Sequence, residues 1–333
     1  MESGRVHAVN KTMHGLFVAA AIALLAPFVS EAKAQKYPER PVKIVLPFGA
    51  GGVADVTARI LAEKLGDRLG QRFVVENMPG AGGISAANAV IGAPADGYTI
   101  GFVTNGTAIS AAQFKNLPFD PVRDFAPITL VAVSPNVLVV NPSIAAASVG
   151  ELVALVKASP GKYSFASPGV GSTPHLSGAL FKHAFGLDLV HVPFNGAGPA
   201  ITSTIAGHTP IAFTALPPAV AHAQSGKLRA LAVMSAKRAV ALPDVPTIAE
   251  AGVSDQEADT LTGLLAPAGT PEEIVDLLQR QVARIVALPD VKERLTALGF
   301  EPVADTPEQF GALIKVEMAK WGRVVREANI RIE

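Results

Sequence analysis

The chain has 333 residues, no cysteine, and 28 basic against 28 acidic residues, so its formal net charge is zero. A neutral chain without basic clusters lacks the electrostatic surface that binds nucleic acid or an anionic membrane, which argues against both partners. The absence of cysteine excludes disulfides and a thiolate nucleophile, and about 300 residues after a leader suffice for two domains with packed cores.

The first segment has the features of a secretory signal. Arg5 and Lys11 precede an apolar stretch over residues 16–29, which is too short for a membrane span. Ala32-Lys33-Ala34 is the small-x-small pattern that signal peptidase requires. We therefore expect a signal peptide over residues 1–34 and a mature chain in the periplasm that begins near Gln35; an uncleaved anchor is the alternative.

Short runs rich in β-branched and aromatic residues alternate with helical patterns along the first half of the mature chain, which is typical of an α/β fold. A helix is predicted over residues 56–69, with Gly70 ending it. Ser134-Pro135-Asn136 is interpreted as a crossing into a second domain, with few regular hydrogen bonds. The predicted strands are 42–48, 73–76, 99–104, 128–133 and 137–140.

The same alternation continues in the second half, and the C-terminal third is helical. Thr270-Pro271-Glu272-Glu273 and Thr306-Pro307-Glu308-Gln309 each predict a capping box with proline at the first helical position. Trp321 on the last helix is interpreted as a core residue. The predicted strands are 163–166, 189–192, 211–214 and 228–234, and the predicted helices are 149–158, 173–183, 200–206, 272–288 and 307–328.

Four glycine-containing turns follow predicted strands and leave the backbone nearly bare of side chains. The first N–H groups of a helix lack intrahelical partners and carry the positive end of the helix dipole, so such turns bind carboxylate or phosphate. Repeated turns of this kind at strand ends indicate one shared cleft. The turns are 47–55, 79–84, 167–173 and 194–199.

Six motifs in a fixed order carry a resemblance to a known family. They are Pro47-Phe48-x-x-Gly51-Gly52-x-x-Asp55, Asn77-x-Pro79-Gly80-Ala81-Gly82-Gly83, Leu117-Pro118-Phe119-Asp120-Pro121-Val122-x-Asp124-Phe125, Ser167-Pro168-Gly169-x-Gly171-Ser172-x-x-His175-Leu176, Leu242-Pro243-Asp244-Val245-Pro246-Thr247 and Pro267-Ala268-Gly269-Thr270-Pro271. Over residues 36–333 the chain resembles the periplasmic solute receptors of the tripartite tricarboxylate transporter family, also called Bug receptors.

The resemblance implies a type II periplasmic binding protein, a Venus flytrap of two α/β domains with a ligand cleft between them. We expect domain 1 over residues 35–135 and 259–333 and domain 2 over residues 136–258. The implied ligand is a small organic acid, and the implied partner is a membrane transporter of the tripartite tricarboxylate type. The resemblance implies neither a cofactor nor catalysis.

The resemblance also implies ligand contacts in the turns, with Phe48 covering the apolar middle of the ligand. Thr104 and Asn105 join the site because they end another predicted strand. Asp55 either caps the helix that follows it or orients a ligand ammonium, hydroxyl or water. His175 either faces the ligand or bonds to the backbone. The predicted ligand-binding residues are Phe48, Gly51, Gly52, Asp55, Thr104, Asn105, Ser167, Gly171, Ser172, Thr173, His175, Asn195 and Gly196.

This chain departs from the family pattern in the cleft. The fourth turn reads Phe194-Asn195-Gly196 and is followed by Ser203, where the family usually has Tyr-Lys-Gly and an aspartate. Leu261 stands where family members often carry tryptophan. We therefore expect a less polar and roomier cleft, and the identity of the ligand stays open.

Two other functions are compatible with parts of the sequence. Gly49-x-Gly51-x-x-Ala54, with Glu76 ending the next strand, satisfies a relaxed dinucleotide fingerprint, so an exported NAD(P)-binding enzyme is one alternative. The export signal, Asp55 beside the expected pyrophosphate and the lack of residues for hydride chemistry argue against it. The other alternative is a co-receptor that presents its ligand to a sensor kinase ectodomain.

Overall fold

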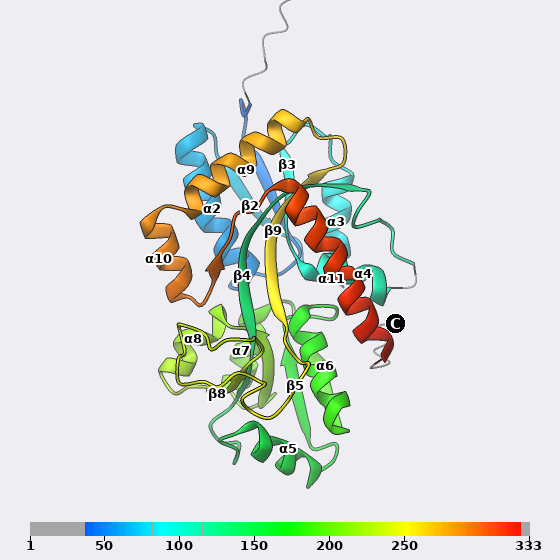
Figure 1. The fold of residues 1–333 in the computed structure, drawn as a ribbon, viewed down its shortest axis with the longest axis vertical. Coiled ribbons are helices and arrows are strands. Elements are labelled where there is room, and N and C mark those ends of the chain that lie inside the picture. Colours follow the sequence, from blue (N-terminus) through cyan, green and yellow to red (C-terminus); the bar gives the residue numbers. More distant parts are fainter. Residues whose placement is uncertain (1–36, 81–82, 115, 328–333) are drawn as a thin grey trace, which may run out of the picture. The chain divides into compact units, whose positions relative to one another are not determined.

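The structure is a computed structural model and describes residues 37–80, 83–114 and 116–327. The predicted signal peptide and its cleavage position lie outside the described residues. From Pro38 onward the chain forms one unit, built on a mixed sheet of ten strands with helices packed against it (Figure 1). None of the helices in the described part is long and apolar enough to cross a membrane.

The first half of the sheet has the order β2-β1-β3-β9-β4. The first three strands run parallel, whereas β9 pairs antiparallel with both β3 and β4. Helix α2 ends at Gly70, which has a left-handed φ of 71°, as the sequence predicts. The elements are β1 (Val42–Leu46), α2 (Val53–Leu69), β2 (Phe73–Asn77), α3 (Ile84–Ile91), β3 (Thr99–Thr104), α4 (Asn105–Gln113) and β9 (Asp259–Pro267).

The second half continues the sheet through β7, β5 and β6, while β8 pairs with β4. Strands β5, β6 and β7 run parallel to one another, and Phe165, Phe181 and Phe213 form the centre of their core. The elements are α5 (Val149–Lys157), β5 (Tyr163–Ser167), α6 (Thr173–Phe185), β6 (Leu189–Pro193), α7 (Ala197–Ile205), β7 (Ile211–Ala215), α8 (Pro217–Gln224) and β8 (Arg229–Val233).

The two halves share one long strand, β4 (Phe125–Val140), which runs beside β9 through the middle of the fold (Figure 1). The prediction of two strands with a loosely bonded crossing at Ser134-Pro135-Asn136 is wrong. Ser134 and Pro135 still pair with β9, and Asn136 begins the pairing with β7. At Pro135 and Asn136 strand β4 changes its pairing partner from β9 to β7, and this stretch is paired strand. The predicted domain boundaries stay a prediction.

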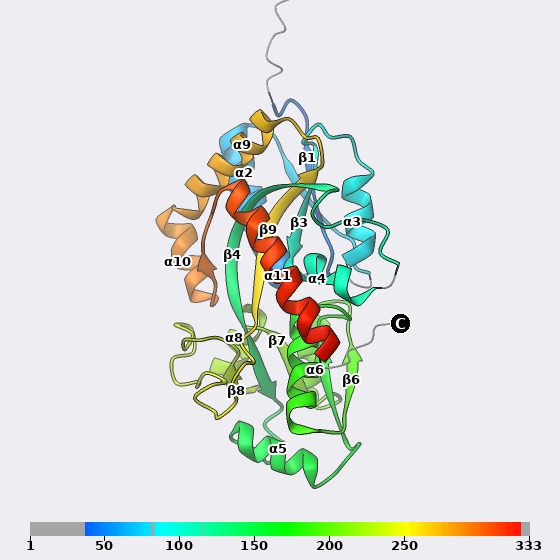
Figure 2. The same cartoon turned by 45° about the vertical axis from the view of Figure 1, so that its right-hand side comes forward.

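The C-terminal helices cover the first half of the sheet, and α11 packs on α4 and β4 (Figure 2). The capping box at Thr306 is confirmed, because Thr306 N–H donates to Gln309 Oε1 at 3.0 Å and Gln309 N–H donates to Thr306 Oγ1 at 3.3 Å. The box predicted at Thr270 is wrong, since its hydroxyl donates to the Pro267 carbonyl and the helix is capped by Pro271. The elements are α9 (Glu272–Val286), α10 (Pro289–Ala297), β10 (Glu301–Pro302) and α11 (Pro307–Glu327).

Candidate functional site

Four helix N-termini meet around one small cavity, here called the inner cavity. Helices α2, α4, α6 and α7 follow the carboxyl ends of β1, β3, β5 and β6, so the parallel strands of both halves point their loops at the same place. The inner cavity has a volume of about 40 Å³. It is lined by Phe48, Gly52, Val53, Ala54, Asp55, Thr104, Pro168, Ser172, Thr173, Pro174, Ala197, Ala215 and Thr260.

The electrostatics of the inner cavity come from the backbone. Among its lining residues in the described part of the chain, none is lysine, arginine or histidine, and Asp55 is the one acidic side chain. The first N–H groups of α2, at Val53 and Ala54, have no partner within the helix. Each helix adds the positive end of its dipole, so the cavity favours an anion without a cationic side chain.

Asp55 braces the turn before α2 and is itself neutralised. Its carboxylate accepts from Arg59 Nη2 at 2.8 Å, from Gly51 N–H at 3.0 Å and from Asn77 Nδ2 at 3.1 Å. Burial raises the pKa of Asp55, but the hydrogen bonds from Arg59, Gly51 and Asn77 outweigh it and leave the pKa below its ordinary value. The interpretation of Asp55 as the N-cap is wrong, because Gly52 occupies that position.

The hydroxyl groups of Ser172, Thr173 and Thr260 at the inner cavity have already donated their protons, whereas that of Thr104 accepts from Gly106 N–H at 3.2 Å. Ser172 is the N-cap of α6; it accepts from His175 N–H at 3.3 Å and donates to the Gly169 carbonyl at 2.7 Å. Thr173 donates to Asn105 Oδ1 at 2.6 Å, and Thr260 donates to Asn136 Oδ1 at 2.7 Å. In this arrangement a bound carboxylate takes its hydrogen bonds from backbone N–H groups, from the Thr104 hydroxyl or from water.

The stacked rings of His175, His191 and Phe165 support the third glycine turn, residues 167–173. His175 Nδ1 accepts from Gly171 N–H at 3.3 Å, which confirms the backbone bond expected as one alternative for this residue. Its ring lies 4.1 Å from that of His191, whose Nε2 pairs with Ser167 Oγ at 2.7 Å and whose ring also stacks on Phe165. Burial lowers the pKa of His175 to about 4 and that of His191 to about 3. Both rings are therefore neutral near pH 7.

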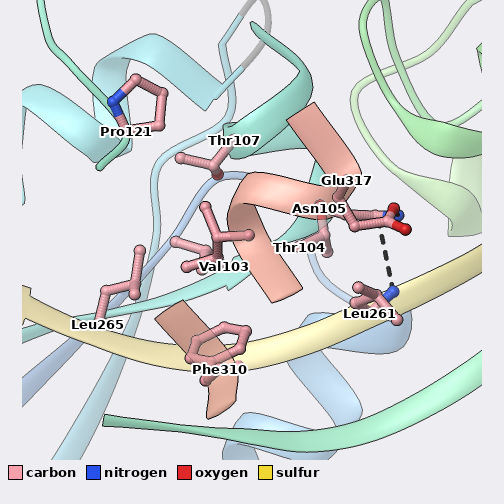
Figure 3. A pocket seen from close by; sticks show the side chains of 11 residues that line it. Val103, Thr104, Asn105, Thr107, Pro121, Leu261, Leu265, Phe310 and Glu317 are labelled. Atoms are coloured by element: carbon pink, nitrogen blue, oxygen red, sulfur yellow. Dashed lines mark hydrogen bonds between the residues drawn. The ribbon is translucent and has the colours of Figure 1, made fainter. Parts of the chain in front are cut away.

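Asn105 lies on a separate cavity of about 20 Å³ beneath α11 (Figure 3). Its Nδ2 donates to Glu317 Oε2 at 2.8 Å and to the Asp259 carbonyl at 3.0 Å, and its Oδ1 accepts from Thr173 and, at 3.4 Å, from Leu261 N–H. The side-chain amide is thus fully used by protein partners, and the predicted contact of Asn105 with a ligand stays a prediction. Glu317 also accepts from Trp321 Nε1 at 2.8 Å, and Trp321 is 1% exposed, which confirms it as a core residue.

A third cavity, here called the outer cavity, has a volume of about 200 Å³ and shares Phe48 and Pro168 with the inner one. Residues from all four predicted turns line it, so the expectation of one shared cleft is met among the residues described. The lining residues are Pro47, Phe48, Pro79, Gly80, Pro168, Gly169, Val170, Pro193, Phe194 and Asn195.

The predicted residues fall into three groups. Phe48, Gly52, Asp55, Thr104, Ser172 and Thr173 line the inner cavity, and Asn195 lines the outer one. Gly51, Asn105, Ser167, Gly171, His175 and Gly196 line neither; they cap, brace or join the elements that do. The sequence reasoning missed Val53, Ala54, Pro168, Pro174, Ala197, Ala215 and Thr260. Most of these are small apolar residues next to a glycine or serine of a turn. They could have been predicted from their position beside a predicted site residue.

The fold and the cavity together define an α/β protein of the periplasmic binding class. Three solved structures share this two-domain fold: BugD, a periplasmic binding protein (TM-score 0.86, 34% identity, 89% of this chain and 100% of that one), a Rhodopseudomonas palustris protein with adipate (0.86, 35%, 89% and 99%), and MatC from Rhodopseudomonas palustris with bound malate (0.83, 34%, 87% and 100%).

The profile of the tripartite tricarboxylate transporter family receptor matches residues 57–330 of this chain. The chain belongs to this family, as its six motifs indicate.

Proposed function

We propose that this chain is a periplasmic receptor that binds a small organic acid at the inner cavity and delivers it to a membrane transporter of the tripartite tricarboxylate type. The convergence of four helix N-termini on one cavity without a cationic lining residue carries the proposal. Family membership, and the adipate and malate in two similar structures, support the class of ligand. Export through a signal peptide over residues 1–34 is part of the same proposal.

The size of the inner cavity supports a carboxylate group as its occupant. A volume of about 40 Å³ is small beside ordinary ligand pockets, so we place only the carboxylate group of the acid there. The rest of the ligand therefore lies toward the outer cavity, and the acid enters when the two halves of the cleft separate.

The contacts around α2 argue against a dinucleotide. Glu76, the acid expected to hold a ribose, is paired with Lys43 Nζ at 2.8 Å. Asp55 lines the cavity where a pyrophosphate would sit, and none of the described lining residues is a lysine or arginine that would balance the charge of that group. We propose no reaction for this chain.

The binding step is tested by calorimetry on the purified periplasmic protein with matched ligands. Hexanoate or adipate should bind, whereas the corresponding amides hexanamide and adipamide, which have the same chain length and no negative charge, should bind at least tenfold more weakly. The site is tested by Ala54→Leu, which fills the inner cavity, against Ala154→Leu, the same change on the exposed face of α5.

We expect binding to be lost in Ala54→Leu alone. Equal affinity for the acid and its amide would overturn the proposal, and this comparison stands even if the Ala54 variant does not fold. Delivery is tested by uptake of the labelled acid in cells that lack the gene and are complemented with either variant. Normal uptake without the receptor, together with ligand-dependent binding to a sensor kinase ectodomain, would instead favour the co-receptor function.

A further inference from the structure

The outer cavity carries no charge among the lining residues that the structure describes. Six of its ten lining residues are proline or phenylalanine, Asn195 contributes the single polar side chain, and backbone groups make part of its surface polar. Proline loses no side-chain entropy when a ligand orders against it, so these walls form a rigid apolar surface. A carboxylate placed here would meet no cation among these residues, and contact with the apolar side chains would cost it part of its hydration.

The two cavities therefore differ in the chemistry they accept, although they share a wall. Phe48 and Pro168 line both, so a ligand that passes between these two side chains reaches from one cavity into the other. At the inner end it meets the N-termini of α2 and α6, and at the outer end it meets Phe194 and Val170.

The charged side chains near the inner cavity also favour a ligand with a single negative charge. Asp55 lines that cavity, and Arg59 already neutralises it through two donors to its carboxylate. No cation among the described lining residues is left to balance a second negative charge on the ligand. The second carboxylate of a dianion therefore gains no compensating charge at the outer end.

We propose that the outer cavity is a subsite for an apolar ligand tail, so that this chain prefers acids with one carboxylate and an aliphatic or aromatic end over dicarboxylates of the same length. The inference rests on the proposed function, since it takes the carboxylate to be held at the inner cavity. It sets this chain apart from its similar structures with adipate and malate, both of which are dicarboxylates.

The test compares hexanoate with adipate, which have six carbons each and differ at one end. Calorimetry on the wild-type protein should give hexanoate at least a tenfold lower Kd. Phe194→Ser removes an apolar wall of the outer cavity only, and should weaken hexanoate at least fivefold while leaving the short acid propionate within twofold.

Asn195→Lys tests the same idea in the opposite direction. Asn195 is exposed and lines the outer cavity, so a lysine there is tolerated and supplies the missing cation. This variant should shift the ratio of the two affinities at least tenfold toward adipate, a result that a merely structural effect does not produce.

The outcomes separate the two proposals. If adipate binds the wild-type protein more tightly than hexanoate, or if neither variant moves the ratio, the tail subsite is wrong while the receptor function stands. If neither acid binds at all, the receptor function fails and the subsite fails with it.

Discussion

Gly49 lies where the first and fourth turns touch, and replacing it with alanine should block closure of the cleft. A Cβ at this position would overlap the carbonyl oxygen of Asn195, and a Cβ at Gly196 would already lie 3.4 Å from Gly49 N. Gly49 does not have a positive φ, so alanine adopts its backbone conformation without strain. The whole effect of Gly49→Ala therefore comes from the contact between the two turns.

Overpacking by one methyl group costs about 1–3 kcal/mol. If this cost falls only on the closed form, the Kd for the ligand rises about 5- to 150-fold. The ligand-free protein, when it rests with the turns apart, is not destabilised and gains about 0.4–1 kcal/mol because alanine restricts the unfolded chain. Affinity and stability should thus change in opposite directions.

Gly150→Ala is the matched control. Gly150 lies in α5, and a Cβ added to it would have no other atom within 4 Å, so alanine there should stabilise the fold by about 1 kcal/mol and leave binding unchanged. The assays are calorimetry, urea unfolding without ligand, and small-angle scattering with and without ligand. Wild-type affinity in Gly49→Ala, or a decrease in radius of gyration on binding equal to that of the wild type, would refute the reasoning.

Two further predictions concern the groups behind the cavity. Ser172→Ala and Ser148→Ala each remove a helix N-cap and should each cost about 1 kcal/mol in urea unfolding, but only the first should weaken ligand binding; an equal effect of both on the Kd would contradict the placement of Ser172 at the cavity. Burial lowers the pKa of His175 to about 4 and of His191 to about 3, below the unfolded value of about 6.5, so the unfolded chain binds protons first and stability is lost as pH falls from about 6.5 toward 4 and 3. His191→Phe should flatten this loss, and parallel pH profiles of the two proteins would show that the ring stack is not its source.

Elements are predicted well from sequence where the deciding contact is local. Thr306 and Gln309 satisfy each other's backbone N–H groups within one turn, and Gly70 ends α2 through its own conformation. Thr270 has a similar pattern, but its hydroxyl bonds to the preceding Pro267 carbonyl and Pro271 is extended, with ψ of 134°, so the helix begins one residue later. The capping-box pattern alone does not show whether the threonine hydroxyl will accept from a backbone N–H of the helix or donate to a carbonyl that precedes it.

The prediction for the crossing between the halves is wrong because proline ordinarily interrupts strand pairing. Pro135 lacks an N–H, yet its carbonyl accepts from Leu216 N–H at 2.9 Å, and Asn136 N–H donates to the Ala258 carbonyl at 3.1 Å. Both partners lie far away in the sequence. Proline usually ends a strand because it has no N–H to donate. β4 nevertheless continues through Pro135, because hydrogen bonds to residues distant in the sequence hold the strand in place.

In the candidate site too, the sequence predicts which residues form the turns but not which hydrogen bonds they make. The glycine turns can be found from sequence, but which N–H groups stay free depends on side chains elsewhere in the fold. Asp55 takes the Gly51 N–H, and His175 takes the Gly171 N–H. The donors left for a ligand are the first N–H groups of the helices at the cavity, such as those of Val53 and Ala54, which no side-chain motif marks.

Hydrogen bonds between protein groups join the two halves of the fold, and they determine how much a ligand must contribute to closure of the cleft. Thr173 on α6 donates to Asn105 on α4, and the Asn105 amide also holds the Asp259 carbonyl where β9 crosses between the halves. Because these bonds join protein groups, they stabilise the closed form independently of direct contact with a ligand. A ligand then shifts the population only by its differential affinity for the closed form, and the measured Kd is the intrinsic one divided by the closed fraction. Substitutions at Asn105 that loosen this joint should therefore weaken every ligand by the same factor, whereas substitutions in the outer cavity should change which ligand is preferred.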